Sequence, residues 1–342
     1  MLISAYSTVR ARVSHDFPVV NERSRWEVGA TDAELDAHLS ALERWAMSNS
    51  RASDPSRRLL INHINDTRRL YQFELDAHDP KHLDNLRRFS EASNSILLVD
   101  GALLDGDGRP LLSGPHGTPT GWVPITSRAR SRRDEVRSWL ESNVQLQVPN
   151  FLPPIRSADE LEFRSAIDVA LGIISLVMAS DYAASVIAGS PINQKAMEAT
   201  FPRAFASLAP SHRELFETND SALARTVQPV IEAAQELLWT VSRSMPGWPA
   251  QAADAAEVMR LALAEGEQVG VDTARLRPAD EILDEYECIQ DLALAQNGQL
   301  CDLAITRQRL IGLTWATHAH LDWDQATARV DALISGDDGQ AT

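Results

Sequence analysis

Cysteine is scarce in this chain. Its 342 residues include two cysteines, Cys288 and Cys301, too few for the disulfide framework that stabilises many small secreted domains. Both fall in stretches with helical periodicity, where a free cysteine usually packs as a small apolar residue. We therefore expect two packing residues rather than a redox pair.

Long apolar runs and targeting signals are also missing. The longest uncharged apolar run is 169–180, between Asp168 and Asp181, and it is shorter than the ~20 residues that a membrane-spanning helix needs. The first residues place no basic region before their apolar ones, unlike a signal peptide. These features predict a cytoplasmic protein with a buried core helix and no membrane partner.

The sequence shows no familiar catalytic or cofactor motif, such as a nucleophile elbow or a phosphate-binding loop. His318 and His320 are two residues apart on an expected helix, so they point about 200° from each other and lack the regular spacing of metal ligands. Residues 105–108, Asp-Gly-Asp-Gly, lack the further acidic ligands of a calcium loop and predict a hairpin turn. No metal or cofactor is expected.

Acidic residues are concentrated in the second half of the chain, whose overall net charge is −16. Residues 1–150 hold 19 basic and 20 acidic residues, whereas residues 151–342 hold 13 basic and 28 acidic ones, a net charge of −15. Such a surface repels phosphate backbones and attracts basic proteins, so nucleic acid is an unfavourable partner. The same acidity would also keep a helical domain soluble without any partner.

The first part of the chain predicts a small α+β domain, residues 1–112. Helices are expected to begin near Asp32, Asp54 and Asp79, because apolar residues at helical spacing follow each of them. Short apolar or alternating segments predict strands at 2–7, 70–76, 95–100 and 102–104. The next residues, 113–130, are rich in proline and glycine, which is typical of a linker.

Residues 131–335 predict a larger all-helical domain, so the chain is mainly α overall. Ser157-Ala-Asp-Glu160 and Ser211-His-Arg-Glu214 have the pattern of a capping box, in which two side chains satisfy free backbone N–H groups at a helix start. We expect the first of these helices to run from 157 to about 188, and Pro229 to kink or break a later one. Residues 336–342 are predicted to form a flexible tail.

Several short motifs between residues 131 and 330 resemble a known family by their order and spacing. They are Val148-Pro-Asn-Phe-Leu-Pro-Pro154, Glu162-Phe-Arg-Ser-Ala166, Leu237-Leu-Trp239, Trp248-Pro249, Arg277-Pro-Ala-Asp-Glu-Ile-Leu-Asp284, Arg309, Trp315 and Trp323-Asp324. Together they resemble the bacterial family catalogued as domain of unknown function 4272, which implies no established activity. The chain departs from that pattern at several polar positions, where relatives tend to carry other residues; these are Leu171 or Gly172, Leu294, Gln308 and Thr314.

The candidate site is a polar cluster of Arg277, Glu281, Asp284, Arg309 and Asp324. Glu281 and Asp284 are three residues apart, which places them on one helix face. Arg309 lies on the following helix, which a short connection makes antiparallel to the first. An arginine between carboxylates can hold a ligand's carboxylate or phosphate with two parallel hydrogen bonds. It can also tie helix ends together, with Asp324 as a cap, and the lack of a neighbouring nucleophile favours this structural role.

The sequence therefore favours a non-catalytic interaction or regulatory protein over an enzyme. Its acidic helical domain would bind a basic protein, and immunity-like neutralisation of a basic toxin or effector is one example. The alternative is an enzyme or small-ligand binder that uses the Arg/carboxylate cluster. Nucleic-acid binding through the arginines of 128–137 is disfavoured, because Asp134 and Glu135 interrupt them and no aromatic residue is interleaved with them before Trp139. The oligomeric state stays open.

Overall fold

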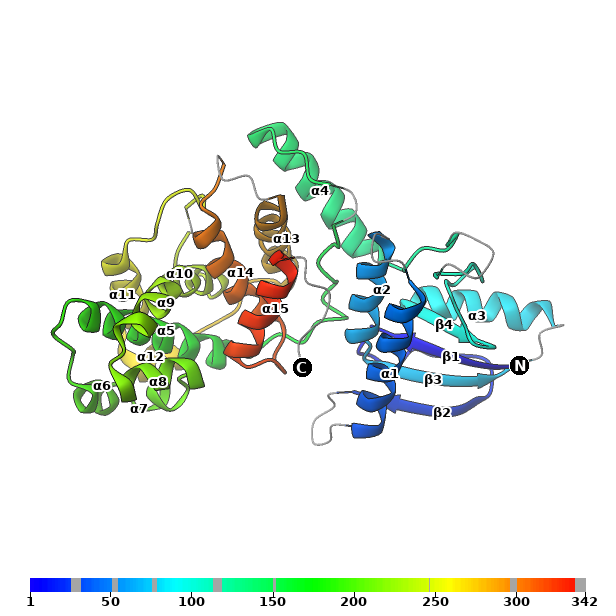
Figure 1. The fold of residues 1–342 in the computed structure, drawn as a ribbon, viewed down its shortest axis with the longest axis horizontal. Coiled ribbons are helices and arrows are strands. Elements are labelled where there is room, and N and C mark those ends of the chain that lie inside the picture. The colour runs from blue at the N-terminus through cyan, green and yellow to red at the C-terminus, as the bar shows by residue number, and fades with distance from the viewer. Residues whose placement is uncertain are drawn as a thin grey trace. The chain divides into compact units, whose positions relative to one another are not determined.

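A small α+β part precedes a larger helical part in the computed structural model of the chain (Figure 1), which confirms the predicted fold class. The chain divides into two compact units. Unit 1 comprises Met1–Ser131 and Pro153–Leu161, and unit 2 comprises Arg132–Leu152 and Glu162–Thr342. The predicted linker lies partly, and the predicted tail entirely, outside the residues that the structure describes. These are 1–25, 32–50, 55–75, 79–112, 119–149, 152–245, 247–295 and 300–335.

An antiparallel sheet with the strand order β2-β3-β1-β4-β5 forms the middle of unit 1 (Figure 1). In the central strand β1, Tyr6 pairs with Leu70 of β3 and with Ile96 of β4. The strands are β1 (Leu2–Ser7), β2 (Val19–Ser24), β3 (Arg69–Glu74), β4 (Ser95–Val99) and β5 (Ala102–Leu104). The helices that accompany them are α1 (Ala33–Asn49), α2 (Pro55–Asn65) and α3 (Pro80–Ala92).

Helices cover both faces of this sheet, because successive side chains of a strand point to opposite faces. Tyr6 lies in one apolar cluster with Leu39 of α1 and Ile61 of α2. Phe73 lies in the other cluster with Phe89 of α3, and their rings meet edge to face with centroids 5.0 Å apart. The sheet is therefore the middle layer of three.

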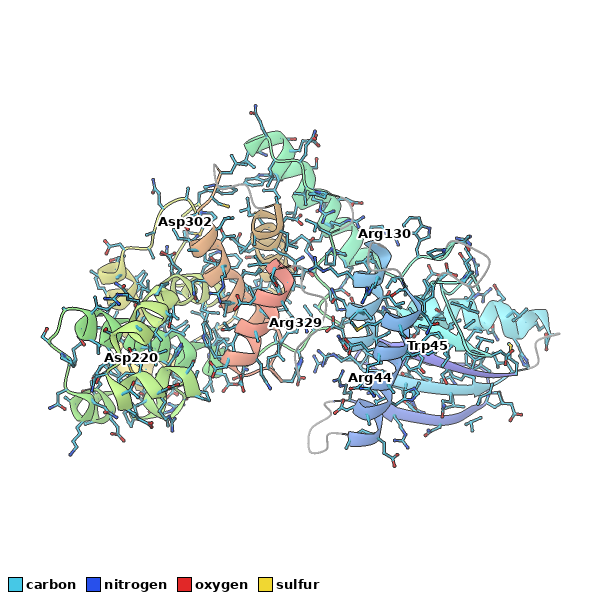
Figure 2. The ribbon with its side chains drawn as sticks, in the orientation of Figure 1. Arg44, Trp45, Arg130, Asp220, Asp302 and Arg329 are labelled. Carbon is cyan, nitrogen blue, oxygen red and sulfur yellow. The ribbon has the colours of Figure 1, made fainter. Side chains whose placement is uncertain are left out.

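Unit 2 is helical in all the elements that the structure describes there. Aspartates begin several of its helices, as predicted for N-caps. Asp220 accepts a hydrogen bond from the N–H of Ala222 (2.7 Å), and Asp302 accepts one from that of Ala304 (2.8 Å) (Figure 2). The helices are α4 (Ser127–Val144, which begins in unit 1), α5 (Ala166–Ile187), α6 (Gln194–Thr200), α7 (Pro202–Ala206), α8 (Pro210–Thr218), α9 (Ser221–Val227), the short 3₁₀ helix η1 (Gln228–Val230), α10 (Ile231–Thr240), α11 (Ala255–Leu263), α12 (Gly266–Asp272), α13 (Ala279–Ala295), α14 (Leu303–Thr317) and α15 (Trp323–Ser335).

Helix α5 contains the apolar run noted in the sequence and packs against α7 to α12. Val169, Ile173 and Leu176 are buried in it. By length and composition, α5 is the one helix among the described residues that could cross a membrane, but most of it lies inside unit 2. This burial agrees with the prediction of a core helix.

Neither predicted capping box caps a helix, although α8 does begin at Pro210, next to the second one. Helix α5 begins at Ala166, capped by Ser165, whose hydroxyl accepts a hydrogen bond from the N–H of Asp168 (3.1 Å). Ser157 and Glu160 do bind each other, but they form a turn in unit 1. At the second site, Ser211 binds Asp324 rather than Glu214. In both cases, a side chain that the local pattern assigned to capping binds a residue that is distant in the sequence.

Other local predictions are confirmed. The chain breaks its helix at Pro229, within η1 between α9 and α10. Asp105 makes a hairpin turn, because its carboxylate accepts hydrogen bonds from the N–H groups of Asp107 (3.0 Å) and Arg109 (2.8 Å). Strand β2 was not predicted, and its residues Val19–Ser24 are mostly polar and half-buried.

Glycine permits close packing at the core of unit 2. A Cβ atom on Gly172 of α5 would lie 2.3 Å from the ring of Trp315. That ring is held from other sides by the guanidinium of Arg164, 4.3 Å from its centroid, and by Trp323, whose ring centroid is 5.9 Å away. It therefore has little room to withdraw.

We predict that Gly172→Ala destabilises unit 2 by about 1–3 kcal/mol, the usual cost of overpacking a filled core, despite the better helix propensity of alanine. Urea unfolding followed by tryptophan fluorescence measures the change. Gly247→Ala is the matched control, because its Cβ would meet nothing within 4 Å. Equal stability of Gly172→Ala and the wild type would show that Trp315 moves freely.

Candidate functional site

The structure distributes the five predicted site residues over separate places in unit 2. Arg277 donates from Nε to the carbonyl oxygen of Trp239 (2.7 Å) and from Nη1 to Glu281 (3.2 Å). Its guanidinium also lies over the ring of Trp239, 5.0 Å from the centroid. Arg277 thus fastens the start of α13 to the end of α10.

Asp284 and Asp324 have different surroundings. Asp284 is an exposed residue of α13. Partial burial of its carboxyl group raises its pKa, and the charge of Arg132 opposes this increase, whereas the charges of Asp280 and Glu135 add to it. The Asp324 carboxylate at the start of α15 accepts hydrogen bonds from the hydroxyl and the N–H of Ser211 (3.2 Å for the N–H). Asp324 therefore joins α15 to the first turn of α8.

Arg309 lies in the interior, with 1 % of its surface exposed. Its Nη2 donates to Glu232 (3.2 Å) and its Nη1 to the carbonyl oxygen of Gly247. Its Nε lies 4.0 Å from Oε2 of Glu236. The ion-pair partners of Arg309 are therefore on α10, whereas the sequence had suggested Glu281 and Asp284 of α13. We call Arg309, Glu232, Glu236 and Glu285 the Arg309 centre.

The Arg309 centre holds more carboxyl groups than its guanidinium can balance. Burial, together with the charge of Glu285, raises the pKa of Glu236 well above its ordinary value, and Arg309 only partly opposes this. Burial raises the pKa of Glu285 in the same way. Neither carboxyl oxygen of the fully buried Glu236 has a hydrogen-bond partner. Since an unpaired buried charge is costly, we infer that Glu236 holds a proton while Glu232 pairs with Arg309.

Chemically, this arrangement suits a structural centre better than a catalytic one. The nearby thiol of Cys288 is a poor nucleophile, because burial and then the charges of Glu285 and Asp291 raise its pKa well above the ordinary value. Among the residues that the structure describes, no group of three or more His, Cys, Asp or Glu side chains is arranged to hold a metal ion. Arg309 donates hydrogen bonds to Glu232 of α10 and to the carbonyl oxygen of Gly247, and these bonds tie α14 to both segments.

Two further buried ion pairs connect α4 and α13. Arg137 donates from Nε and Nη2 to the two carboxylate oxygens of Asp291 (3.0 and 3.1 Å), a bidentate pair. Arg132 lies 3.8 Å from Glu287. Two arginines of the basic stretch 128–137 are thus neutralised by carboxylates within unit 2.

We predict that Glu236→Gln makes the stability of unit 2 less dependent on pH. The folded chain keeps a proton that the unfolded chain releases above about pH 4.5, the ordinary pKa of glutamate. The free energy of unfolding therefore falls as the pH rises from there toward the raised pKa, by about 1.4 kcal/mol per pH unit for one fully retained proton. Glutamine removes this term, so the variant gains relative stability at pH 8.

Thermal unfolding from pH 5 to pH 9 measures this effect. Glu217→Gln makes the same substitution at an exposed position of α8 and should keep the slope of the wild type. A Glu236→Gln variant that is less stable than the wild type at pH 8 would show that Glu236 is ionised and pairs with Arg309.

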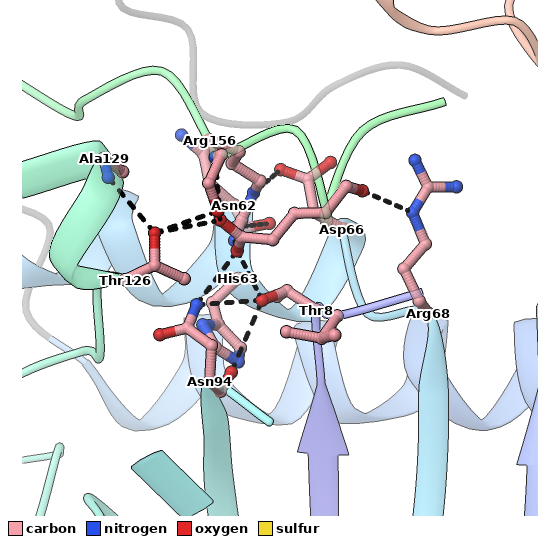
Figure 3. A network of polar contacts seen from close by, with 12 residues as sticks. Thr8, Asn62, His63, Asp66, Arg68, Asn94, Thr126, Ala129 and Arg156 are labelled. Carbon is pink, nitrogen blue, oxygen red and sulfur yellow. Dashed lines mark hydrogen bonds and ion pairs between the residues drawn. The ribbon is translucent and has the colours of Figure 1, made fainter. Parts of the chain in front are cut away.

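Unit 1 has a buried polar network of its own, centred on Glu160 (Figure 3). One carboxylate oxygen of Glu160 accepts hydrogen bonds from Thr8 (2.6 Å), Asn94 (3.0 Å) and Arg156 (3.0 Å). The other accepts bonds from the hydroxyl and the N–H of Ser157 (2.6 and 2.9 Å). This Glu160 network fastens residues 153–161 to the ends of β1 and α3.

The neighbouring groups of the network are also paired. Arg156 donates from Nε to Asp66 (2.8 Å), and Arg68 donates to the carbonyl oxygen of Glu160 (3.2 Å). Burial raises the pKa of Glu160, but Arg156 and the Ser157 hydroxyl outweigh it, so the pKa lies below the ordinary value. Burial and then Arg156 lower the pKa of His63 to about 4, so His63 is neutral at physiological pH. The saturated contacts of Glu160 leave it no lone pair for a ligand, which indicates a structural role.

We predict that Glu160→Gln destabilises unit 1 by about 3 kcal/mol, because it leaves buried donors facing an uncharged amide. Since the folded pKa of Glu160 lies below its unfolded value, its contribution is full above about pH 4.5 and is lost as the pH falls. Hydrogen exchange of the β1 amides measures the loss at pH 7. Asp159→Asn is the control at an exposed neighbour, and equal protection in both variants would contradict the prediction.

The family model described as "Domain of unknown function (DUF4272)" matches residues 132–326, which is more than half of the chain. The chain belongs to the DUF4272 family. The resemblance inferred from the short motifs is thereby confirmed. A search of curated proteins and a search of solved structures found no match. The DUF4272 region includes the Arg309 centre and the two α4–α13 ion pairs, whereas Thr8 and Asn94 of the Glu160 network precede it.

Most of the buried carboxyl groups of the DUF4272 region were not predicted from the sequence. A signal for two of them was present, because Glu232 and Glu236 are four residues apart and flank Ala233 and Ala234 on a mostly apolar helix. Acidic residues on the apolar face of a helix call for a buried partner. The identity of that partner, Arg309, depends on how α10 packs against α14 and is not contained in the local pattern.

Proposed function

We propose that this DUF4272 protein is a cytoplasmic, non-catalytic interaction or regulatory protein whose acidic helical unit binds a basic protein. The observation that carries this proposal is the imbalance of charge on the surface of unit 2. Its most buried arginines, Arg132 and Arg309, neutralise carboxylates of the same unit. The exposed basic residues in the described part of unit 2 are Lys195, Arg213, Arg225, Arg260 and Arg275.

Exposed carboxylates of unit 2 far outnumber these cations. They lie on many elements, including α4, α6, α8, α11 to α13 and α15; among them are Glu141, Glu198, Glu214, Glu217, Glu257, Asp272, Asp280, Asp284 and Asp331. A surface of this kind creates a long-range attraction for a positively charged partner and speeds its association. Immunity-like neutralisation of a basic toxin or effector is one function with this requirement.

Affinity purification of the tagged chain from its native host tests the proposal. We expect a basic protein to be retained at about 0.05 M salt and released at about 0.5 M, because ions screen the attraction between surface charges. Mass spectrometry identifies it, and the purified pair is then tested by calorimetry. Retention that is equal at both salt concentrations, or no retained protein, would count against the proposal.

Charge variants show whether unit 2 provides the attraction. Glu214→Gln combined with Glu217→Gln removes two exposed charges from α8 of unit 2 and should lower the association rate. Glu74→Gln combined with Glu91→Gln removes two exposed charges from unit 1 and should have a smaller effect. The opposite order would place the interaction on unit 1.

A further inference from the structure

Unit 2 has an apolar pocket of about 210 Å³ between α5, α6 and α11. Helix α5 contributes Val177 and Met178, spaced to share one side of the helix with Asp181 one turn later. The other walls come from α6, its neighbours and α11, with Ile192, Ala196, Met197, Thr200, Phe201, Met259 and Leu263. Met178, Met197, Phe201 and Leu263 also belong to an apolar cluster of unit 2, so the pocket is an opening of that core.

Three of the six methionines of the chain line this pocket, namely Met178, Met197 and Met259. Methionine side chains are flexible and polarizable, and they are used where an apolar surface must adapt to a partner. One wall, α6, has no fully buried residue. A short helix with so little burial can adjust its position at small cost.

Asp181 is the one charged residue of the lining. It has no hydrogen bond or ion pair within the part of the chain that the structure describes, and partial burial raises its pKa. On α6, Lys195 and Glu198 balance each other in charge and do not line the pocket. The pocket thus combines an apolar floor with a half-buried carboxylate that is free to pair with a cation from outside.

We propose that this pocket holds the anchor of the basic partner: an apolar side chain of an amphipathic segment, with a lysine or arginine one turn away that pairs with Asp181. The volume favours this occupant, because pockets for drug-sized ligands usually measure about 300–1,000 Å³. A buried apolar anchor inside a charged surface is the usual layout of a binding hot spot. The inference rests on the proposed function and adds the place and the chemistry of the contact.

A labelled peptide made only of leucine and lysine, patterned as an amphipathic helix, tests the pocket on the full-length chain by fluorescence anisotropy. Ala196→Trp fills the pocket from an exposed position of α6, and Ala199→Trp adds the same bulk to an exposed residue of α6 outside the lining. We expect Ala196→Trp to weaken binding about ten-fold or more, the share of one buried apolar side chain. Ala199→Trp should bind as the wild type does. Equal binding by both tryptophan variants would overturn the proposal.

The contribution of charge is tested separately. Asp181→Asn should weaken binding of the peptide about three- to ten-fold, and Glu91→Gln, at an exposed position of α3 in unit 1, should leave it nearly unchanged. A peptide with glutamate in place of lysine should not bind, nor should one with serine in place of leucine. Binding of the glutamate peptide would show an apolar pocket indifferent to charge, and binding of the serine peptide would show attraction without an anchor; either result overturns the proposal.

The native partner separates this inference from the proposed function. Capture of the partner that Ala196→Trp reduces and Ala199→Trp does not supports both. Capture that neither variant changes leaves the proposed function standing and overturns the pocket as its contact. If Ala196→Trp blocks the leucine–lysine peptide while no host partner is found, the pocket binds its class of segment and the proposed function fails.

Discussion

The helical unit depends on the interactions of one buried group, the guanidinium of Arg309. It lies between α14, which carries it, and α10, which supplies Glu232 and Glu236. At the same crossing, a Cβ atom on Gly312 of α14 would lie 3.2 Å from the carbonyl oxygen of Ala233, so the two helices approach closely. A charge buried at such a contact must find its partners there, because water cannot replace them. The positions of Arg309, Glu232 and Glu236 therefore depend on one another.

The same need to pair buried charges applies to other polar residues of this family region. The arginines best placed to orient a ligand, Arg137, Arg277 and Arg309, each bind a carboxylate of their own unit. Glu236 of α10 and Glu285 of α13, whose pKa values are raised by burial, are held among helices. The described surface of unit 2 carries more exposed carboxylates than exposed basic residues, and it includes the apolar pocket between α5, α6 and α11.

Much of the secondary structure could be predicted, because its signals are local. The alternation in residues 70–76 and the apolar spacing after Asp79 correspond to β3 and α3. Predictions failed where one side chain had both a local and a distant partner. Glu160 fits a capping box with Ser157, yet its deciding contacts are Thr8 and Asn94, more than sixty residues earlier. The candidate site failed to converge for the same reason, since helical spacing shows which residues share a face and not which helix that face meets.

The position of Glu160 also has a consequence for how the protein is made. Unit 1 comprises Met1–Ser131 and Pro153–Leu161, so the chain enters unit 2 for residues 132–152 and then returns. During synthesis the sheet emerges first, but the carboxylate that binds Thr8 and Asn94 emerges only after those intervening residues. The side-chain donors of Thr8 and Asn94 therefore lack their Glu160 acceptor until about thirty more residues have been added beyond residue 131. For the same reason, no single cleavage point separates two complete units. A DUF4272 region cut out at residue 132 would include residues 153–161, which belong to unit 1.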